Sequence, residues 1–292
     1  MLWRVSLSKL IYHYSDANAL KSIIENKEIW LTGHSFLNDE MEFHEGFDLL
    51  NKNIGKVVEQ NNFTERSKQI LSEITDHVSS SLVFSCSFSS EPDLLSQWRS
   101  YCPQDGGFSI GFDKELLQKS ICGHNPTGNI RRFDDCIYDE SEKLRQAEVI
   151  ADGCCKGIDL HFEKMGRDVF YNTFLEFLFY SFRCKNSHFI EEKEVRVFTY
   201  AHNKFERISI NDGSGFPAIE FFSKENVQFR TNKNIFIPYL KQSFPIEAIK
   251  EIYVGPCKNR DVVVQGLQLF LQNLGLINQV NIILSNIPYR RF

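Results

Sequence analysis

The chain has 292 residues, of which 42% are hydrophobic and 24% charged, and its formal net charge is −5. This composition is typical of one large globular domain or two closely packed ones, and the negative charge argues against a surface covered with nucleic-acid contacts. No window is apolar over the length that a bilayer requires, and no signal peptide is apparent, so we expect a cytoplasmic protein that does not enter a membrane. The eight cysteines contain no C-x-x-C pair, so we expect reduced thiols and no metal site.

Strand and helix signals alternate in the first part of the chain. The pattern predicts a strand over residues 10–14, a helix that begins at Ser15 or Asp16 and ends near Asn26, and a strand over residues 28–32. Further signals predict a cap at Asn38 and Asp39, a helix that contains Glu42 and runs through Leu50, a helix over 64–77, a strand over 81–89, a short helix over 91–101 and a strand over 106–112.

Residues 139–184 lack proline and have helical apolar spacing, which predicts two helices broken near the glycines at 153–157. The remainder is mainly strand, with expected strands over 195–200, 216–222, 234–240, 246–254 and 280–284 and a helix over 260–273. The expected fold is therefore α+β: a mixed, mostly antiparallel sheet in a single domain over 1–292, with 139–184 as a helical insertion or lobe.

The stretch "HFIEEKEVRVFTY" combines strand-forming residues with an unusual density of charge. If it is one strand, Glu192, Glu194 and Arg196 share one face, while Lys193 and the valines that follow it share the other. The valine face is expected to be buried. The charged face is then either a solvated surface with cross-strand ion pairs or the floor of a cleft.

Five stretches of the chain together resemble a bacterial family, the domain-of-unknown-function family 2971. They are "IYHYSD", "LTGHSFLNDEMEF", "FSCSFSSEPDLLSQWRSY" with "GGFSIGF", "EEKEVRVF", and "EIYVGP" with "SNIPYRRF". The strand that bears His13, followed by a helix and the strand "EIWLTG", is in turn similar to the opening of the ADP-ribosyltransferase fold. Ser85 and Ser87 of "FSCSF" match the Ser-Thr-Ser signature of that fold only approximately.

The second resemblance implies a protein that consumes NAD and transfers ADP-ribose to a protein or nucleic acid, as a toxin or antiphage effector with a neutralising or defence partner. It implies that Glu194 binds the ribose 2′-hydroxyl, that Glu192 orients or deprotonates the acceptor, and that His13 binds a ribose. The implied NAD-binding residues are Trp98 or Tyr101 for stacking, Arg99 for the pyrophosphate, and Tyr14, Ser15 and Arg196. His13 and Glu194 are then expected on neighbouring strands that face one cleft, with the pair supplied from outside the 139–184 helices.

Two other classes of function stay open. Glu191 and Lys193 form the E-x-K half-motif of metal-dependent nucleases, although strand parity places them on the face expected to be buried. A non-catalytic module that senses a ligand would have the same fold. Several of the residues also have structural explanations: Trp98 has helical spacing from Leu94 and Leu95, and the basic end "PYRRF" is either a phosphate contact or a solvated tail.

Overall fold

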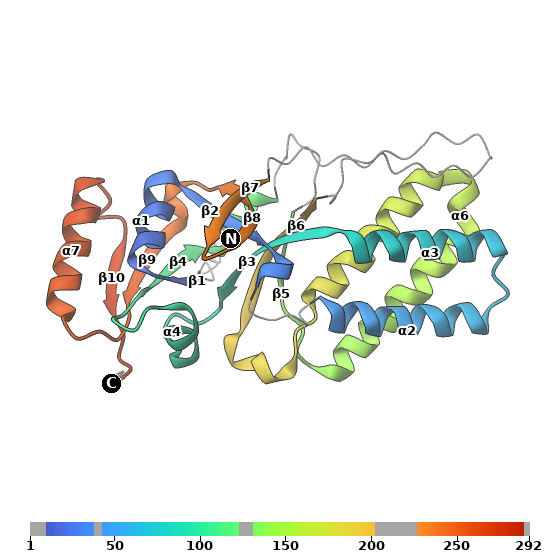
Figure 1. Cartoon of the computed structure of the whole chain (residues 1–292), viewed down its shortest axis with the longest axis horizontal. Coiled ribbons are helices and arrows are strands. Elements are labelled where there is room, and N and C mark those ends of the chain that lie inside the picture. The colour runs from blue at the N-terminus through green and yellow to red at the C-terminus, as the bar shows by residue number, and fades with distance from the viewer. Residues whose placement is uncertain (1–9, 38–42, 123–130, 202–226, 289–292) are drawn as a thin grey trace, which may run out of the picture.

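The structure, a computed structural model, describes residues 10–37, 43–122, 131–201 and 227–288, which form an open sheet with helices on both faces (Figure 1). Its strands are β1 Leu10–Ser15, β2 Glu28–Gly33, β3 Leu82–Ser89, β4 Phe108–Asp113, β5 Arg132–Asp135, β6 Glu194–Ala201, β7 Gln228–Asn232, β8 Ile235–Ser243, β9 Ile249–Val254 and β10 Asn281–Leu284. Its α-helices are α1 Ala17–Asn26, α2 His44–Gln60, α3 Glu65–Ser80, α4 Leu95–Tyr101, α5 Lys114–Ile121, α6 Glu140–Arg183 and α7 Arg260–Asn273, and its 3-10 helices are η1 His34–Phe36, η2 Ser187–Glu192 and η3 Ile246–Ala248.

The predicted α+β class and the mostly antiparallel sheet are confirmed. The strand order is β10-β9-β4-β1-β3-β2-β8-β7, with β6 on β3 and β5 on β6. The β9–β10 pair is parallel, because α7 carries the chain back between the two strands, and the other pairs are antiparallel. The cap expected at Ser15 or Asp16 is Asp16, and Thr64 caps α3 in the same way, since each side chain accepts a hydrogen bond from the first turn of its helix.

The sheet divides along one edge of β3. On that edge β1 pairs with β3 at Tyr12 and Ser89, whereas β2 pairs with it at Thr32–Ser85 and Gly33–Phe84. The other edge of β3 pairs with β6 over the full length of the strand. The strands β1 and β2 therefore diverge over residues 86–88, and the sheet has an opening between them.

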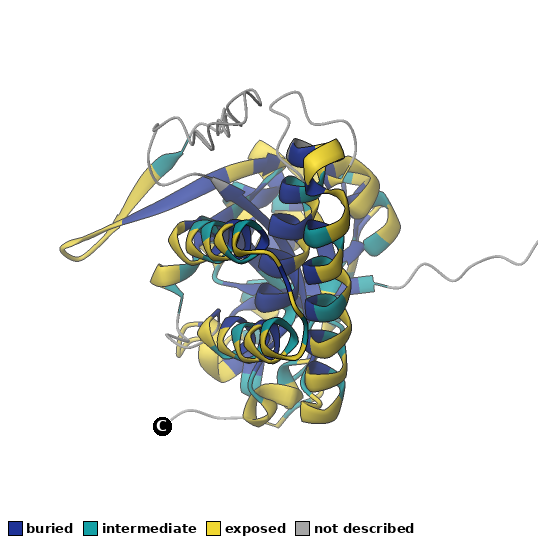
Figure 2. Cartoon of the chain, turned by 90° about the vertical axis from the view of Figure 1, so that its right-hand side faces the viewer, coloured by how far each residue is buried: buried dark blue, intermediate teal, exposed yellow. Residues whose placement is uncertain are grey.

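The two faces of the sheet cover different cores. One face packs against α1, α5 and α7 in a large apolar cluster that includes Phe88, Ile110 and Val197. On the opposite face, α2, α3 and α6 form a helical lobe whose apolar cluster reaches the sheet at Val83, Phe198 and Tyr200. Figure 2, which looks onto the side of the molecule that carries the lobe, shows the buried and exposed faces of its helices.

The break expected at residues 153–157 is wrong, because α6 is helical from Glu140 to Arg183. The helix nevertheless doubles back. Tyr180 Oη donates a hydrogen bond of 2.8 Å to the carbonyl oxygen of Lys143, whereas a straight helix would hold these residues about 55 Å apart at 1.5 Å per residue. The two arms lie beside α2 and α3 (Figure 1). Gly153 and Gly157 lie within the first arm, so helical packing overrides their weak helix propensity.

Local pattern also missed three short elements, namely α5, β5 and β7. The predicted strand over 216–222, the caps at Asn38 and Asp39, Glu42 and the end of the chain after Pro288 lie outside the described residues. Within the described part of the chain, no helix has the length and apolar character needed to cross a membrane.

The contact of α2 with the second arm of α6 depends on Gly46. A Cβ atom at this position would lie 2.7 Å from the carbonyl oxygen of Ser181, closer than real Cβ atoms approach a backbone. We expect Gly46→Ala to lower the free energy of unfolding by about 1–3 kcal/mol through overpacking. Gly55→Ala in the same helix is the matched control: it meets no atom within 4 Å, and should raise stability by about 0.5–1 kcal/mol. Urea unfolding of both variants measures the difference, and equal effects would contradict the close approach.

Candidate functional site

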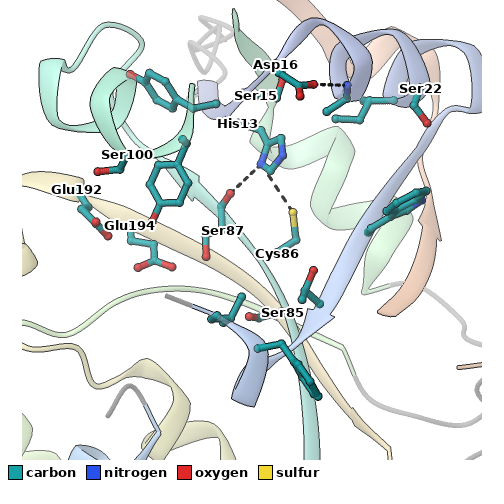
Figure 3. A pocket seen from close by; sticks show the side chains of 18 of the residues that line it. His13, Ser15, Asp16, Ser22, Ser85, Cys86, Ser87, Ser100, Glu192 and Glu194 are labelled. Atoms are coloured by element: carbon teal, nitrogen blue, oxygen red, sulfur yellow. Dashed lines mark hydrogen bonds between the residues drawn. The ribbon is translucent and has the colours of Figure 1, made fainter. Parts of the chain in front are cut away.

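A cavity of about 810 Å³ occupies the opening between β1 and β2 (Figure 3). Its volume lies within the range of about 300–1,000 Å³ typical of small-molecule sites. The side chains of β3 at 85–87 form one wall, β2 and β7 contribute a second, and α1 a third. The end of α4 and the segment from Lys185 to Glu194 complete the lining, so residues distant in the sequence meet here.

His13 bridges the opening in the sheet. Its Nδ1 lies 3.0 Å from the carbonyl oxygen of Ser87, on the stretch of β3 where β1 has already diverged. A carbonyl oxygen can only accept, so Nδ1 carries the proton and donates. Burial lowers the pKa of His13, with the Ser87 bond acting in the opposite direction, so the ring is neutral near pH 7. The neutral ring then has Nε2 as a hydrogen-bond acceptor.

The charged stretch of the sequence forms a buried ion network. Arg196 donates through Nε to Glu194 Oε1 at 2.6 Å, through a second nitrogen to Oε2 at 3.0 Å, and through a third to the carbonyl oxygen of Phe182 at 2.9 Å. Lys185 Nζ bonds both Glu194 and Glu192. The side chains of Glu194 and Arg196 are 4% and 1% exposed. The network thus holds two carboxylates and two cations, whose formal charges cancel, and Arg196 is the one member that does not itself line the cavity.

The environment of Glu194 keeps its carboxylate ionised. Burial acts to raise its pKa, but the neighbouring Arg196 and Lys185 outweigh burial and lower the pKa from 4.5 to about 2. The Cys86 thiol on the adjacent strand behaves in the opposite way, since burial raises its pKa to about 12. Cys86 is therefore a neutral thiol at pH 7.

The depressed pKa of Glu194 predicts a specific loss of stability in acid. The unfolded carboxyl binds a proton below about pH 4.5, whereas the folded one resists protonation until about pH 2, so the unfolded state binds more protons between these values. The contribution of Glu194 is therefore complete above pH 4.5 and is lost as the pH falls toward 2. Urea unfolding of the wild type and Glu194→Gln at pH 2.5 to 6 measures this. The stability difference should narrow in acid, and a difference independent of pH would contradict it.

Glu192 differs from Glu194 in its position. The residues before Lys193 do not continue β6 as expected: Ser187–Glu192 form η2, and Lys193 has a left-handed φ of 45° that turns the chain into the strand. Glu192 bonds Lys185 at 2.7 Å and its side chain is 15% exposed, so it is the more accessible of the two carboxylates in the network. Lys185 also lies 5.1 Å from the ring centre of Phe189, which holds η2 against the cavity.

The predicted site residues separate into two groups. His13, Tyr14, Ser15, Tyr101, Glu192 and Glu194 line the cavity, whereas Trp98, Arg99 and Arg196 do not. The expectation that His13 and Glu194 lie on neighbouring strands is wrong, because β3 separates β1 from β6. Tyr12 pairs with Ser89 and Ser89 pairs with Glu194, so Glu194 lies on the face of Tyr12 and His13 lies on the opposite face. Both side chains nevertheless reach one cavity, because the sheet opens between β1 and β2.

The side chains of Trp98 and Arg196 are buried in other contacts, which keeps them from the ligand contacts that the sequence predicted. Trp98 is 3% exposed, packs edge-to-face against Tyr14, and donates through Nε1 to Asp93 at 2.7 Å. Arg196 is fully engaged in the network described above. A stacked or phosphate-bound role would require either side chain to leave its buried contacts. Arg99 lies on an exposed face of α4 outside the cavity.

The lining residues that sequence reasoning missed include Trp30, Thr32, Lys185 and Arg230. Period-two alternation in "EIWLTG" places Glu28, Trp30 and Thr32 on one face and was available as a signal. Two buried carboxylates need more than one cation to compensate their charge, and this requirement could have indicated a second cation such as Lys185. Arg230 had no local signal, because the short strand that carries it was not predicted.

The E-x-K pair does not lie on a strand. Glu191 is an exposed residue of η2, and Lys193 forms an ion pair with Glu91 at 2.7 Å. The alternation of faces along a strand, which placed Glu191 and Lys193 on a buried face, therefore does not apply to these residues. Among the described residues, no group of three or more His, Cys, Asp or Glu side chains is placed to hold a metal ion.

The fold and the cavity define an α+β protein with a ligand-sized site in a divided sheet. Residues 97–197 match the model of the family described as "Protein of unknown function (DUF2971)", the family that the motifs of the sequence resemble. The matched segment carries Tyr101, Lys185, Glu192 and Glu194, whereas His13 lies outside it. No curated protein and no solved structure matches the chain. The likeness to the ADP-ribosyltransferase fold stays a prediction.

Proposed function

We propose that the chain is an NAD-consuming, ADP-ribosyltransferase-like effector that cleaves the nicotinamide glycosidic bond in this cavity. It would transfer ADP-ribose to a protein or nucleic acid in the cytoplasm, as a toxin or in antiphage defence, under the control of a neutralising or defence partner. The observation that carries the proposal is the placement of His13 and both carboxylates around one cavity in a divided sheet. The cavity is large enough for a ligand of dinucleotide size.

Each polar residue of the cavity has a separate role in the proposed reaction. Departure of nicotinamide takes the electron pair of the C–N bond and leaves an oxocarbenium-like ribose, whose positive charge a fixed carboxylate stabilises. Glu192 is the better placed carboxylate, because it faces the cavity with one cation beside it, whereas Glu194 has two. Glu192 would also accept the proton of the attacking acceptor. Glu194 and Lys185 would position Glu192, and His13 Nε2 would accept a hydrogen bond from a ribose hydroxyl.

One observation favours a second candidate, a module that binds a ligand without cleaving it. The two carboxylates and two cations of the network cancel in formal charge, and Glu194 is almost fully covered. A carboxylate neutralised in this way stabilises a developing cation less than one with a single partner. Such a site would bind NAD or a related nucleotide and report its presence.

Incubation of the full chain with NAD tests the two candidates together. Binding is followed by calorimetry and nicotinamide release by chromatography, with and without a cell extract as the source of acceptor and with and without EDTA. Nicotinamide release that is insensitive to EDTA supports the transferase, and binding without release supports the sensing module. Absence of binding at millimolar NAD would overturn both.

A further inference from the structure

A second polar group lines the cavity near the pairing of β2 with β3. It consists of Ser85 of β3, Thr32 of β2 and Arg230 of β7, three residues that line the cavity and that sequence reasoning assigned to no phosphate contact. Thr32 is the direct register partner of Ser85, so the two hydroxyl side chains are neighbours on the same face of the sheet. Pairing through β8 brings Arg230 to that face as well.

The hydroxyl groups of Thr32 and Ser85 are available to donate hydrogen bonds into the cavity. Arg230 donates to Thr32 Oγ1 at 3.2 Å, so the Thr32 oxygen acts as acceptor and its hydroxyl hydrogen can serve a ligand. Ser85 is 2% exposed, and its Oγ has no hydrogen-bond partner among the described residues. A buried hydroxyl without a partner is costly, and such a group in a cavity wall indicates a ligand atom that completes it.

The surroundings specify the kind of ligand. Arg230 also lies 5.8 Å from the ring centre of Trp30, which stacks on Tyr239 at 4.3 Å, so the guanidinium is held beside a rigid aromatic pair. Two hydroxyl donors and a guanidinium suit the oxygens of a phosphoryl group, and the carboxylate that β2 adds to the lining, Glu28, is paired with Lys241 at 3.2 Å. We infer that Ser85, Thr32 and Arg230 form a subsite for the phosphate groups of a nucleoside diphosphate.

This inference rests on the proposed function, since both concern the same cavity, and it fixes the orientation of the ligand. The diphosphate lies on the β2–β7 side, so the nicotinamide ribose extends across His13 toward Glu192 and Tyr101. It also replaces Arg99 as the predicted pyrophosphate partner with a cation that lies in the cavity.

Calorimetry with pyrophosphate, ADP and adenosine tests the subsite on the full chain. Ser85→Ala and Thr32→Val each remove one hydroxyl at nearly constant shape, and each is expected to weaken ADP binding about tenfold to a hundredfold, the effect of one hydrogen bond to a charged group. Added salt should weaken ADP binding through Arg230, and adenosine affinity should not change in either variant. Ser22→Ala is the matched control, because Ser22 lines the same cavity from α1 and does not belong to the Ser85, Thr32 and Arg230 group.

The folded state of the variants provides an independent readout. Ser85→Ala removes a buried hydroxyl that lacks a partner, so its melting temperature without ligand should equal or exceed that of the wild type while ADP affinity falls. ADP affinity unchanged in both Ser85→Ala and Thr32→Val, or no binding of ADP or pyrophosphate at millimolar concentration, would overturn the subsite.

The same measurements separate this inference from the proposed function. If ADP and pyrophosphate bind through Ser85 and Thr32 while NAD is neither bound nor cleaved, the subsite stands and the proposed function fails. If NAD is cleaved and the two variants bind and cleave it as the wild type does, the proposed function stands and the subsite fails.

Discussion

Replacement of Arg196 by methionine is expected to lower the free energy of unfolding by about 3–5 kcal/mol, the largest effect on stability that we predict. Arg196 is 1% exposed, and its loss leaves the buried Glu194 with one cation and the carbonyl oxygen of Phe182 without its donor. Urea or guanidinium unfolding measures the change. Arg145→Met is the matched control, because Arg145 makes a similar two-pronged pair with Glu142 on an exposed surface and its removal should have little effect.

A double variant separates the ion pair from general packing. If the penalty comes from an uncompensated carboxylate, Arg196→Met combined with Glu194→Leu should recover part of the stability lost by Arg196→Met alone, since a buried pair replaced on both sides by apolar groups is often nearly neutral. Simple additivity of the two losses would show that the network does not act as a unit and would contradict the prediction.

Replacement of Glu192 by glutamine is expected to slow nicotinamide release by roughly a hundredfold or more if the proposed function holds, because it removes the accessible negative charge beside the reacting ribose. The fold should persist, since glutamine has the same shape and still accepts from Lys185. Nicotinamide release and melting temperature are measured on the same protein. Glu191→Gln is the matched control: its side chain is exposed in the same 3-10 helix and does not line the cavity.

The control also distinguishes the reaction classes. Wild-type NAD turnover in Glu192→Gln would rule out the role that we assign to this carboxylate. A metal-dependent nuclease activity that Glu191→Gln abolishes would instead support the E-x-K interpretation. The expectation that Glu194 binds the ribose 2′-hydroxyl is tested in parallel by the NAD turnover of Glu194→Gln. This variant should also lose stability, because Glu194 lies between two cations.

Local sequence pattern predicted much of the fold and less of the site. Period-two alternation correctly placed Glu194 and Arg196 on one face of β6, and the apolar periodicity of residues 260–273 gave α7 with the bounds that the structure shows. The alternation failed at Glu192, because Lys193 has a left-handed φ and the strand begins only after it. Lysine rarely adopts this conformation, so the sequence does not predict the turn. Local pattern also failed at Gly153, where packing within the lobe decides the conformation.

The site itself depends on contacts that no local pattern contains. His13 and Glu194 share a cavity through the divergence of β1 and β2 from β3, which is a property of strand order rather than of any one segment. The lining residue Arg230 lies on a short exposed strand, and its neighbour Thr32 is 198 positions away in the sequence. Such pairs become visible only when the order of the strands is known.

The strand β6 is buried on both of its faces, and this limits how the chain can be divided into smaller pieces. Val195 and Val197 belong to the core beneath α1, α5 and α7, while Phe198 and Tyr200 of the same strand belong to the core of the helical lobe. Excision of the lobe would expose the aromatic side of β6 and leave Arg196 without the carbonyl oxygen of Phe182 that it bonds. The lobe is therefore a structural partner of the cavity wall, and the smallest piece of this chain that keeps the ion network intact includes both.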